Sequence, residues 1–162
     1  MKTHAIALTT LMLAMQPMLG QAQWSNDPTQ YIAITEKSDA GQIVTDNQGN
    51  IIIGYSDPST RYDFILKKYD NKGNPLWNNE PVLIRDRNQS FIFTWAIDIG
   101  PNNEVYTSIE DLTTRELIVT KTATDGSPAW TEPFIPQPDD MLSGLTANLA
   151  PSEHGLAIAS CM

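Results

Sequence analysis

The chain has very little of the chemistry that disulfides and metal sites need. Among its 162 residues are one cysteine and two histidines. One cysteine excludes an internal disulfide and a cysteine-rich metal site. Basic residues are also few, with 10 Lys and Arg against 19 Asp and Glu, so the net charge is -9. Nucleic acid and anionic membranes attract positive charge, and we expect neither as a partner.

Residues 1–22 differ from the rest of the chain and have the layout of a secretory signal peptide. A basic start precedes an apolar run from Ala5 to Ala14, and Gly20 and Ala22 place small residues at a cleavage site. A membrane anchor is the alternative, but the run is short for the ~30 Å of a hydrocarbon core. We expect cleavage after Ala22 and a product that is secreted or held in the cell envelope.

The remaining sequence repeats itself at a nearly constant interval. Trp24, Trp77 and Trp130 are evenly spaced, and an acid–proline pair follows each of them. Longer segments also align in order: Tyr62–Trp77 with Arg115–Trp130, Ile43–Asp57 with Ile97–Asp111 and, more weakly, Leu149–Pro151 with Ile99–Pro101. Segments repeated in the same order indicate copies of one structural unit.

Each copy has the pattern of short strands joined by tight turns. We expect strands at residues 41–46, 50–57, 63–70 and 75–84 in the first copy, and at 93–99, 104–111, 116–124 and 128–135 in the second. These segments are rich in Ile, Val, Tyr and Thr, and Asp, Asn and Gly between them favour hairpin turns. A short helix after Asp139 is an alternative for one segment, although the repeat register favours a loop and then a strand.

Runs of apolar residues indicate that both faces of each sheet are covered. Ile51–Ile53, Phe64–Leu66 and Leu117–Val119 are apolar at consecutive positions, whereas a one-sided sheet alternates apolar with polar residues. No amphipathic helix of useful length lies between them, so sheets must stack on sheets. We therefore predict an all-β, β-propeller-like fold. A two-sheet sandwich is the alternative, which explains the strands but not the period.

The repeat divides the chain into five predicted parts. They are a signal peptide (1–22), an N-terminal orphan strand segment (23–40), a first β repeat (41–92), a second β repeat (93–140) and a truncated third repeat (141–162). Propellers close with about 4 to 8 blades, and about two and a half four-stranded blades make an incomplete ring. We expect either an N-terminal fragment of a longer protein or a homo-oligomer that completes a ring.

The segments Tyr62–Trp77 and Trp24–Pro28 resemble repeats in secreted bacterial β-propeller proteins. These are large exported proteins, common in Bacteroidetes-like bacteria, that often end in a type IX secretion sorting domain. The resemblance covers most of residues 24–135. It implies an architecture and an exported location but no activity. Neither a sorting domain nor the Ser-x-Asp-x-Gly-x-Thr-Trp box of sialidase propellers occurs in this sequence.

Few residues are suited to catalysis. His154, the one histidine after the expected cleavage site, lies in a predicted surface turn, and Cys161 lies in an apolar strand, where a buried thiol is usual. Carboxylates are numerous enough for a glycosidase pair. However, Asp57 and Asp111 occupy equivalent positions in the two copies, which indicates a structural role at strand ends. We predict no catalytic residue.

Metal and cofactor sites are not expected either. The turn Asp70–Asn74 has the oxygen-rich composition of a calcium loop, but Lys72 places a positive charge among the supposed ligands. A hairpin turn explains these residues better. No glycine-rich phosphate loop or dinucleotide motif occurs, so we predict no metal and no cofactor.

The aromatic residues are the remaining candidates for a ligand site. Trp77 and Trp130 share one repeat position, which favours packing between copies. Tyr55 and Trp95 lie outside that register and are the better candidates for ligand contact. The main hypothesis is a secreted, non-enzymatic scaffold or binding surface with a cell-surface glycan or protein as partner. The alternatives are a lectin-like carbohydrate binder and part of a glycoside-cleaving propeller.

Overall fold

The computed structural model of the chain describes residues 41–86, 92–111, 113–136 and 146–161. This part of the chain is all-β and forms three antiparallel sheets. The predicted signal peptide with its cleavage site at Ala22, the orphan strand segment 23–40 and Trp24 lie outside the described residues. Within those residues, no helix has the length and apolar character needed to cross a membrane.

The first sheet is a four-stranded meander. Its strands are β1 (Gln42–Thr45), β2 (Ile51–Asp57), β3 (Asp63–Tyr69) and β4 (Val82–Arg85), each paired antiparallel with the next. The 3-10 turn η1 (Pro58–Thr60) follows β2, and η2 (Trp77–Asn79) precedes β4. The first three strands were predicted within one residue of these bounds.

The second and third sheets have fewer strands. The second contains β5 (Ile92–Ile99), β6 (Val105–Asp111) and β7 (Glu116–Thr122), and the third contains β8 (Thr146–Ser152) and β9 (Gly155–Cys161). The strand expected after the loop near Asp139 is β8, although residues 137–145 themselves are not described. The structure confirms the all-β prediction. It does not show a closed ring.

The fourth strand of each predicted copy is the part that the sequence predicted wrongly. The segment 75–84 forms a strand only from Val82, because Trp77, Asn78 and Asn79 have positive φ and make the turn η2. In the second copy, the segment 128–135 makes only isolated bridges, at Pro128 and Phe134. Proline has no backbone N–H, so the prolines of this segment interrupt a regular ladder.

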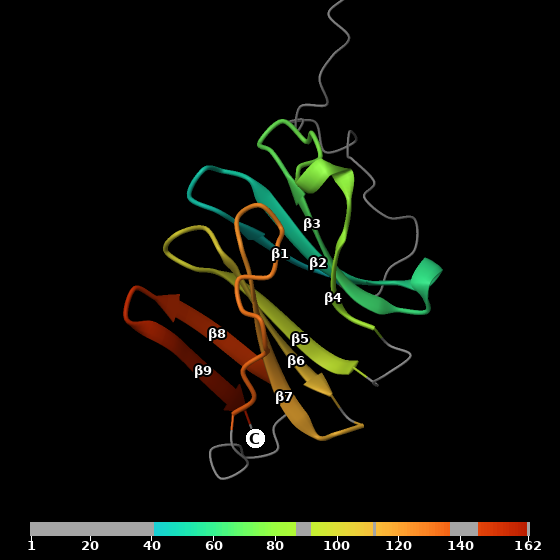
Figure 1. Cartoon of the computed structure of the whole chain (residues 1–162), viewed down its shortest axis with the longest axis vertical. Helices are drawn as coiled ribbons and strands as arrows, with labels where there is room; N and C mark the ends of the chain where they lie inside the picture. Colours follow the sequence, from blue (N-terminus) through green and yellow to red (C-terminus); the bar gives the residue numbers. More distant parts are fainter. Residues whose placement is uncertain (1–40, 87–91, 112, 137–145, 162) are drawn as a thin grey trace, which may run out of the picture.

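The three sheets follow one another in space with their faces in contact (Figure 1). Buried side chains of the first sheet pack against those of the second in one apolar cluster: Ile52, Phe64 and Leu66 meet Ile97, Val105 and Ile109. We call this the first interface. Gly54 lies there because a Cβ on it would approach Phe64 to 3.0 Å and Ile97 to 3.2 Å. Burial of each apolar side chain contributes about 1.5–3 kcal/mol.

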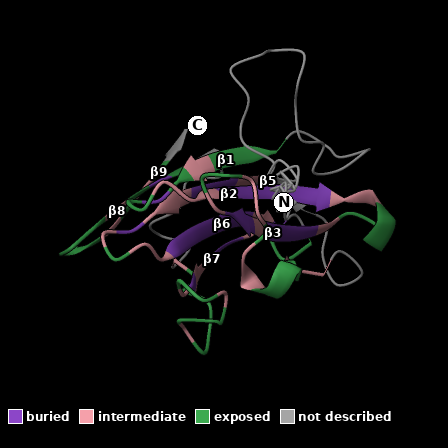
Figure 2. Ribbon diagram, turned by 90° about the horizontal axis from the view of Figure 1, so that it is seen from above, coloured by how far each residue is buried: buried purple, intermediate pink, exposed green. Residues whose placement is uncertain are grey.

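The apolar runs of the first two sheets are buried on both faces, as the sequence predicted. On the first sheet, Ile53, Tyr55, Ile65 and Tyr69 form a second buried cluster on the face opposite the first interface. On the second sheet, Leu117 and Val119 pack with Trp130 and with Leu156 and Ile158 of β9. We call this the second interface. Figure 2 shows the buried residues concentrated in the central strands.

The turns of the first two sheets have the same backbone hydrogen bonds. Equivalent bonds occur at positions that the sequence repeat aligns: Asp70 N–H to Asn74 and Ala123 N–H to Ser127; Leu76 N–H to Lys68 and Ala129 N–H to Lys121; Asp46 N–H to Asn50 and Gly100 N–H to Glu104. The bridges Tyr69–Pro75 and Thr122–Pro128 match in the same way. The two sheets therefore share turn geometry as well as strand order.

Candidate functional site

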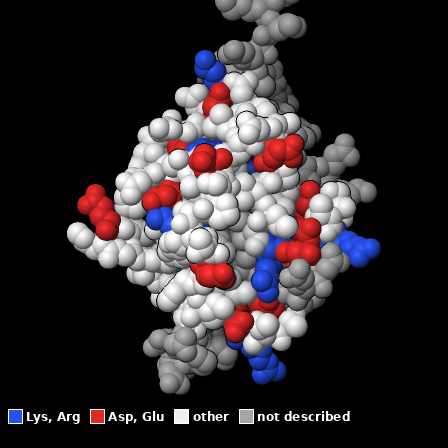
Figure 3. Space-filling view, in the orientation of Figure 1, with Lys and Arg blue, Asp and Glu red and all other residues white. Residues whose placement is uncertain are grey.

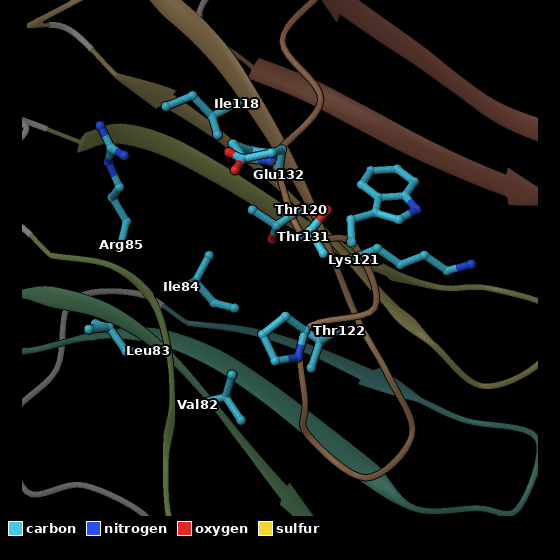
Figure 4. A pocket seen from close by; sticks show the side chains of 13 residues that line it. Val82, Leu83, Ile84, Arg85, Ile118, Thr120, Lys121, Thr122, Thr131 and Glu132 are labelled. Carbon is cyan, nitrogen blue, oxygen red and sulfur yellow. The ribbon is translucent and has the colours of Figure 1, made fainter.

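A cavity of about 290 Å³ lies between the outer strand of the first sheet and the outer part of the second. Its walls come from Val82–Arg85 on β4, from the segment Pro128–Pro133 and from four residues of β7, namely Ile118, Thr120, Lys121 and Thr122. Figure 4 shows Ile118, Thr120 and Thr122 of β7 across the space from Val82 and Ile84 of β4. Ligand pockets of about 300–1,000 Å³ are usual, so this cavity suits a small group.

Arg85 at one end of the cavity is bound to a buried carboxylate. Its Nη2 lies 2.7 Å from Asp111 Oδ2, and the Asp111 side chain is fully buried. The other oxygen, Oδ1, accepts the backbone N–H of Thr113 (2.9 Å) and Thr114 (3.3 Å). Burial opposes ionisation of Asp111, but the hydrogen bonds from Arg85 and these N–H groups outweigh it and lower its pKa. A carboxyl with a lowered pKa is a poor general acid at neutral pH.

Lys121, also in the lining, is bound to protein groups as well. Its Nζ lies 2.8 Å from Glu104 Oε1 and 5.1 Å from the ring centre of Tyr106. The hydrogen bonds to Glu104 and Tyr106 raise the pKa of Lys121. The hydroxyl of Thr120 is buried and has no hydrogen-bond partner among the described residues. The lining therefore offers mainly apolar contact together with the exposed carboxylate of Glu132.

The first sheet has a corresponding lysine pair. Lys68 Nζ lies 2.9 Å from Asp46 Oδ2, with side-chain exposures of 5% and 0%, and 5.8 Å from the ring centre of Trp77. Asp46 also accepts hydrogen bonds from Gln48 and Asn50. Burial raises the pKa of Asp46, but the bonds from the Asn50 and Lys68 side chains outweigh it, so the pKa is lowered overall. This pair secures the β1–β2 turn against β3.

Polar side chains connect the first two sheets around the first interface. Gln42 Nε2 donates to the Trp95 carbonyl oxygen (3.1 Å), and Gln42 Oε1 accepts the Ile97 N–H (2.9 Å). Asn47 N–H donates to Asn103 Oδ1 (2.9 Å). The Gln42 bonds use backbone groups at the edge of β5 that faces away from β6. A side-chain amide suits such an edge because its NH2 group donates and its oxygen accepts.

Trp77 makes a further connection between these sheets. Its indole Nε1 donates to the Thr124 carbonyl oxygen (2.9 Å), in the turn after β7. Gly126 of the same turn lies under the ring, since a Cβ there would be 2.9 Å from Trp77 Cγ. Trp130 lies at the second interface, 5.7 Å from Tyr106 in an edge-on arrangement. Both tryptophans therefore pack where sheets meet.

The structure does not bring together Tyr55 and Trp95, the candidates for ligand contact. Tyr55 is 2% exposed and belongs to the cluster on the far face of the first sheet. Burial, with a smaller effect from Asp57, raises the pKa of its hydroxyl. Trp95 is half-buried at the first interface, with its ring centre 5.1 Å from that of Phe64. Each aromatic ring therefore has a packing partner.

The other residues considered from the sequence lie in turns or at strand ends. Asp57 accepts Ser59 N–H (2.8 Å) at η1, and Asp70 accepts Lys72 and Asn74 N–H (both 2.8 Å), which confirms the hairpin turn. His154 is exposed between β8 and β9. Cys161 lies in β9, but its side chain is outside the described part. Within that part, no group of three or more His, Cys, Asp or Glu residues is placed to hold a metal ion.

The residues that connect the sheets were not predicted from the sequence. The signal for the lysine pairs was available, because Lys68 and Lys121 align in the repeat. Gln42 and Asn47 gave no such signal, because Ala96 and Pro101 stand at the aligned positions. Their role depends on how the sheets stack, which residue spacing within one copy does not show.

Neither the surface charge nor comparison with known proteins identifies a more specific site. Acidic and basic side chains lie interspersed over the face shown in Figure 3, so this face has no large field of one sign. Scans against models of protein families, curated proteins and solved structures found no match.

Proposed function

We propose that the chain is an exported, non-enzymatic module of β-propeller type that acts outside the cell as a scaffold or binding surface. The first interface is the observation that carries this proposal. There an apolar core is framed by Gln42, Asn47 and Trp77, each bonded to the next sheet. The third sheet packs on the second through Leu156 and Ile158. Units that cover one another's faces in sequence are typical of repeat architectures.

Shared turn geometry supports interpreting the sheets as propeller blades in an incomplete ring. Equivalent hydrogen bonds at aligned positions are expected of repeated blades and not of a sandwich. The resemblance of Tyr62–Trp77 to repeats of secreted bacterial propeller proteins agrees with this.

The proposed export is tested by the first residue of the mature product. Expression of the complete sequence in a bacterial host should yield an exported protein that begins at Gln23, because a signal peptidase cleaves after Ala22. Amino-terminal sequencing of the exported fraction measures this directly. A product that retains Met1 and stays in the cytoplasm contradicts the proposal.

Carbohydrate binding is the second candidate, and the cavity between β4 and β7 is the observation that favours it. The exposed carboxylate of Glu132 can accept hydrogen bonds from hydroxyl groups, and the apolar walls suit a sugar's carbon face. Under either role we propose a cell-surface glycan or a protein as the partner. Nucleic acid is not proposed, because the net charge is -9.

A glycan array and a panel of chromogenic glycosides separate these roles. Neither binding nor turnover is expected for a pure scaffold. Saturable glycan binding that Glu132→Ala abolishes, and that Glu153→Ala in the exposed β8–β9 turn leaves intact, supports the second candidate. Glycoside turnover by the purified, folded chain identifies an enzyme and contradicts a non-enzymatic role.

A further inference from the structure

The outer edge of β9 is free in the described structure. Among the described residues, β9 pairs only with β8. The corresponding second strands of the other sheets, β2 and β6, have partners on both edges. An unpaired strand edge exposes a row of backbone donors and acceptors that another extended strand satisfies.

The register of the third sheet shows which residues face this edge. Pro151 lies opposite Leu156, and proline has no N–H to donate, so this is a non-hydrogen-bonded pair. The two kinds of pair alternate along an antiparallel ladder. The backbone groups of Ala157 therefore face β8, whereas those of Leu156 and Ile158 face the free edge.

In the first two sheets, the strands β3 and β7 occupy the edge that corresponds to the outer edge of β9. β3 and β7 pair antiparallel with β2 and β6, and both begin with an acid, continue with three apolar residues and have lysine at the sixth position. The hydrogen bonds of β7 also show which of its backbone groups face each edge. Val119 exchanges hydrogen bonds with Phe134, so Ile118 and Thr120 direct their backbone groups to β6.

Trp130 indicates that a turn should follow a strand that pairs with β9. Trp77 donates to a carbonyl oxygen in the turn after β7 and packs over Gly126. Trp130 is the equivalent tryptophan of the second copy, is partly buried against Leu117 and Val119, and has no hydrogen-bond acceptor for its indole N–H among the described residues. A turn that continues from a strand on β9 would supply that acceptor.

We propose that β9 binds an extended polypeptide strand in antiparallel orientation along its free edge. The strand has the pattern of β3 and β7, namely an acid, three apolar residues and a following lysine, and it continues into a glycine-containing turn over Trp130. Strand addition of this kind uses main-chain hydrogen bonds for affinity and alternate side chains for specificity. The inference rests on the proposed function, because it treats the sheets as copies of one unit.

A synthetic peptide with the sequence of residues 115–130 tests this with the full chain. NMR titration should show saturable binding, and amide exchange should slow at Leu156 and Ile158 but little at Ala157, whose N–H already faces β8. N-methylation of the peptide at Thr120 removes the donor that faces β9 and should weaken binding at least about tenfold. N-methylation at Val119, whose N–H faces the other way, is the matched control and should have little effect.

Three results would overturn the inference. The first is the absence of saturable binding. The second is equal weakening by the two N-methyl peptides, which shows contact without strand pairing. The third is a chain that is already dimeric with Leu156 and Ile158 protected, which shows that a second copy occupies the edge. Glycoside turnover would overturn the proposed function alone, because it does not change these exchange rates.

Discussion

Lys68 and Lys121 hold equivalent positions but use carboxylates from different ends of a turn. Lys68 pairs with Asp46, which begins the β1–β2 turn, whereas Lys121 pairs with Glu104, which ends the β5–β6 turn. Gly100 stands where the second turn would place the aspartate. A flexible lysine side chain reaches either end, and a buried ammonium requires one such partner. The position of the cation is therefore kept while the partner changes.

Removal of the Lys68 charge should destabilise the protein strongly. Lys68→Met leaves Asp46 buried without its ion partner, which costs about 3–5 kcal/mol. Urea unfolding followed by tryptophan fluorescence measures this loss. Lys72→Met, in the exposed turn that follows β3, is the control and should change stability by less than about 0.5 kcal/mol. Similar midpoints for the two variants would show that the buried pair contributes little.

The contact between Trp77 and Gly126 can be tested with a pair of glycine substitutions. Gly126 (φ +92°) and Gly49 (φ +79°) both have positive φ, so alanine strains the backbone at either site. Only at position 126 does the new Cβ meet the indole, at 2.9 Å; at position 49 the nearest atom is 3.9 Å away. Gly126→Ala should be the more destabilising by about 1–3 kcal/mol in urea unfolding. Equal effects would mean that the turn does not press on Trp77.

At the scale of elements, the sequence predicted the strands and turns that depend on local residue patterns. Ile51–Ile53 and Phe64–Leu66 indicated strands buried on both faces, and the turn at Asp70–Asn74 followed from its Asp, Asn and Gly. The turn η2 was missed because positive φ at three consecutive non-glycine residues, Trp77 to Asn79, has no strong sequence signal. It depends on Trp77 reaching across to Thr124, a contact 47 residues away.

Gln42 should control how firmly β5 is held at the edge that faces away from β6. Gln42→Ala removes both hydrogen bonds to that edge, so the Ile97 amide should exchange faster, with a loss of stability of about 1–3 kcal/mol. Amide exchange by NMR checks this, with Thr45→Ala on exposed β1 as the control. Unchanged exchange at Ile97 would show that packing at the first interface alone holds β5.

At the scale of the whole molecule, stacking could be predicted but the connections between sheets could not. Apolar runs with no helix to cover them required sheet on sheet, and the structure has that arrangement. The cavity, by contrast, is bounded by β4 and β7, which belong to different sheets. Its shape depends on the distance between two units, whereas each residue pattern describes only one. Arg85 and Asp111 likewise meet only after stacking.

The ion pairs within and between the sheets should make the protein sensitive to acid. Burial raises the pKa values of three carboxylates, but hydrogen bonds outweigh this effect and lower them in the folded protein. The donors are Asn50 and Lys68 for Asp46, Lys121 for Glu104, and Arg85 for Asp111. The unfolded chain regains ordinary values of 3.8 for aspartate and 4.5 for glutamate. It therefore binds more protons than the folded chain as the pH falls through this range.

The stability that these carboxylates contribute should be complete at neutral pH and lost as the pH falls below about 4.5 through their lowered folded values. Each group contributes up to about 1.4 kcal/mol per pH unit within its own window. Urea midpoints measured from pH 7 to pH 2.5 should therefore fall steeply at the acid end. Asp111→Asn should flatten that fall, because the substitution removes one titrating group and leaves Arg85 without its carboxylate at every pH. Glu153→Gln, in the exposed β8–β9 turn, should reproduce the parent curve. Midpoints that stay level down to pH 3 would show that the ion pairs across and within the sheets do not stabilise the stack.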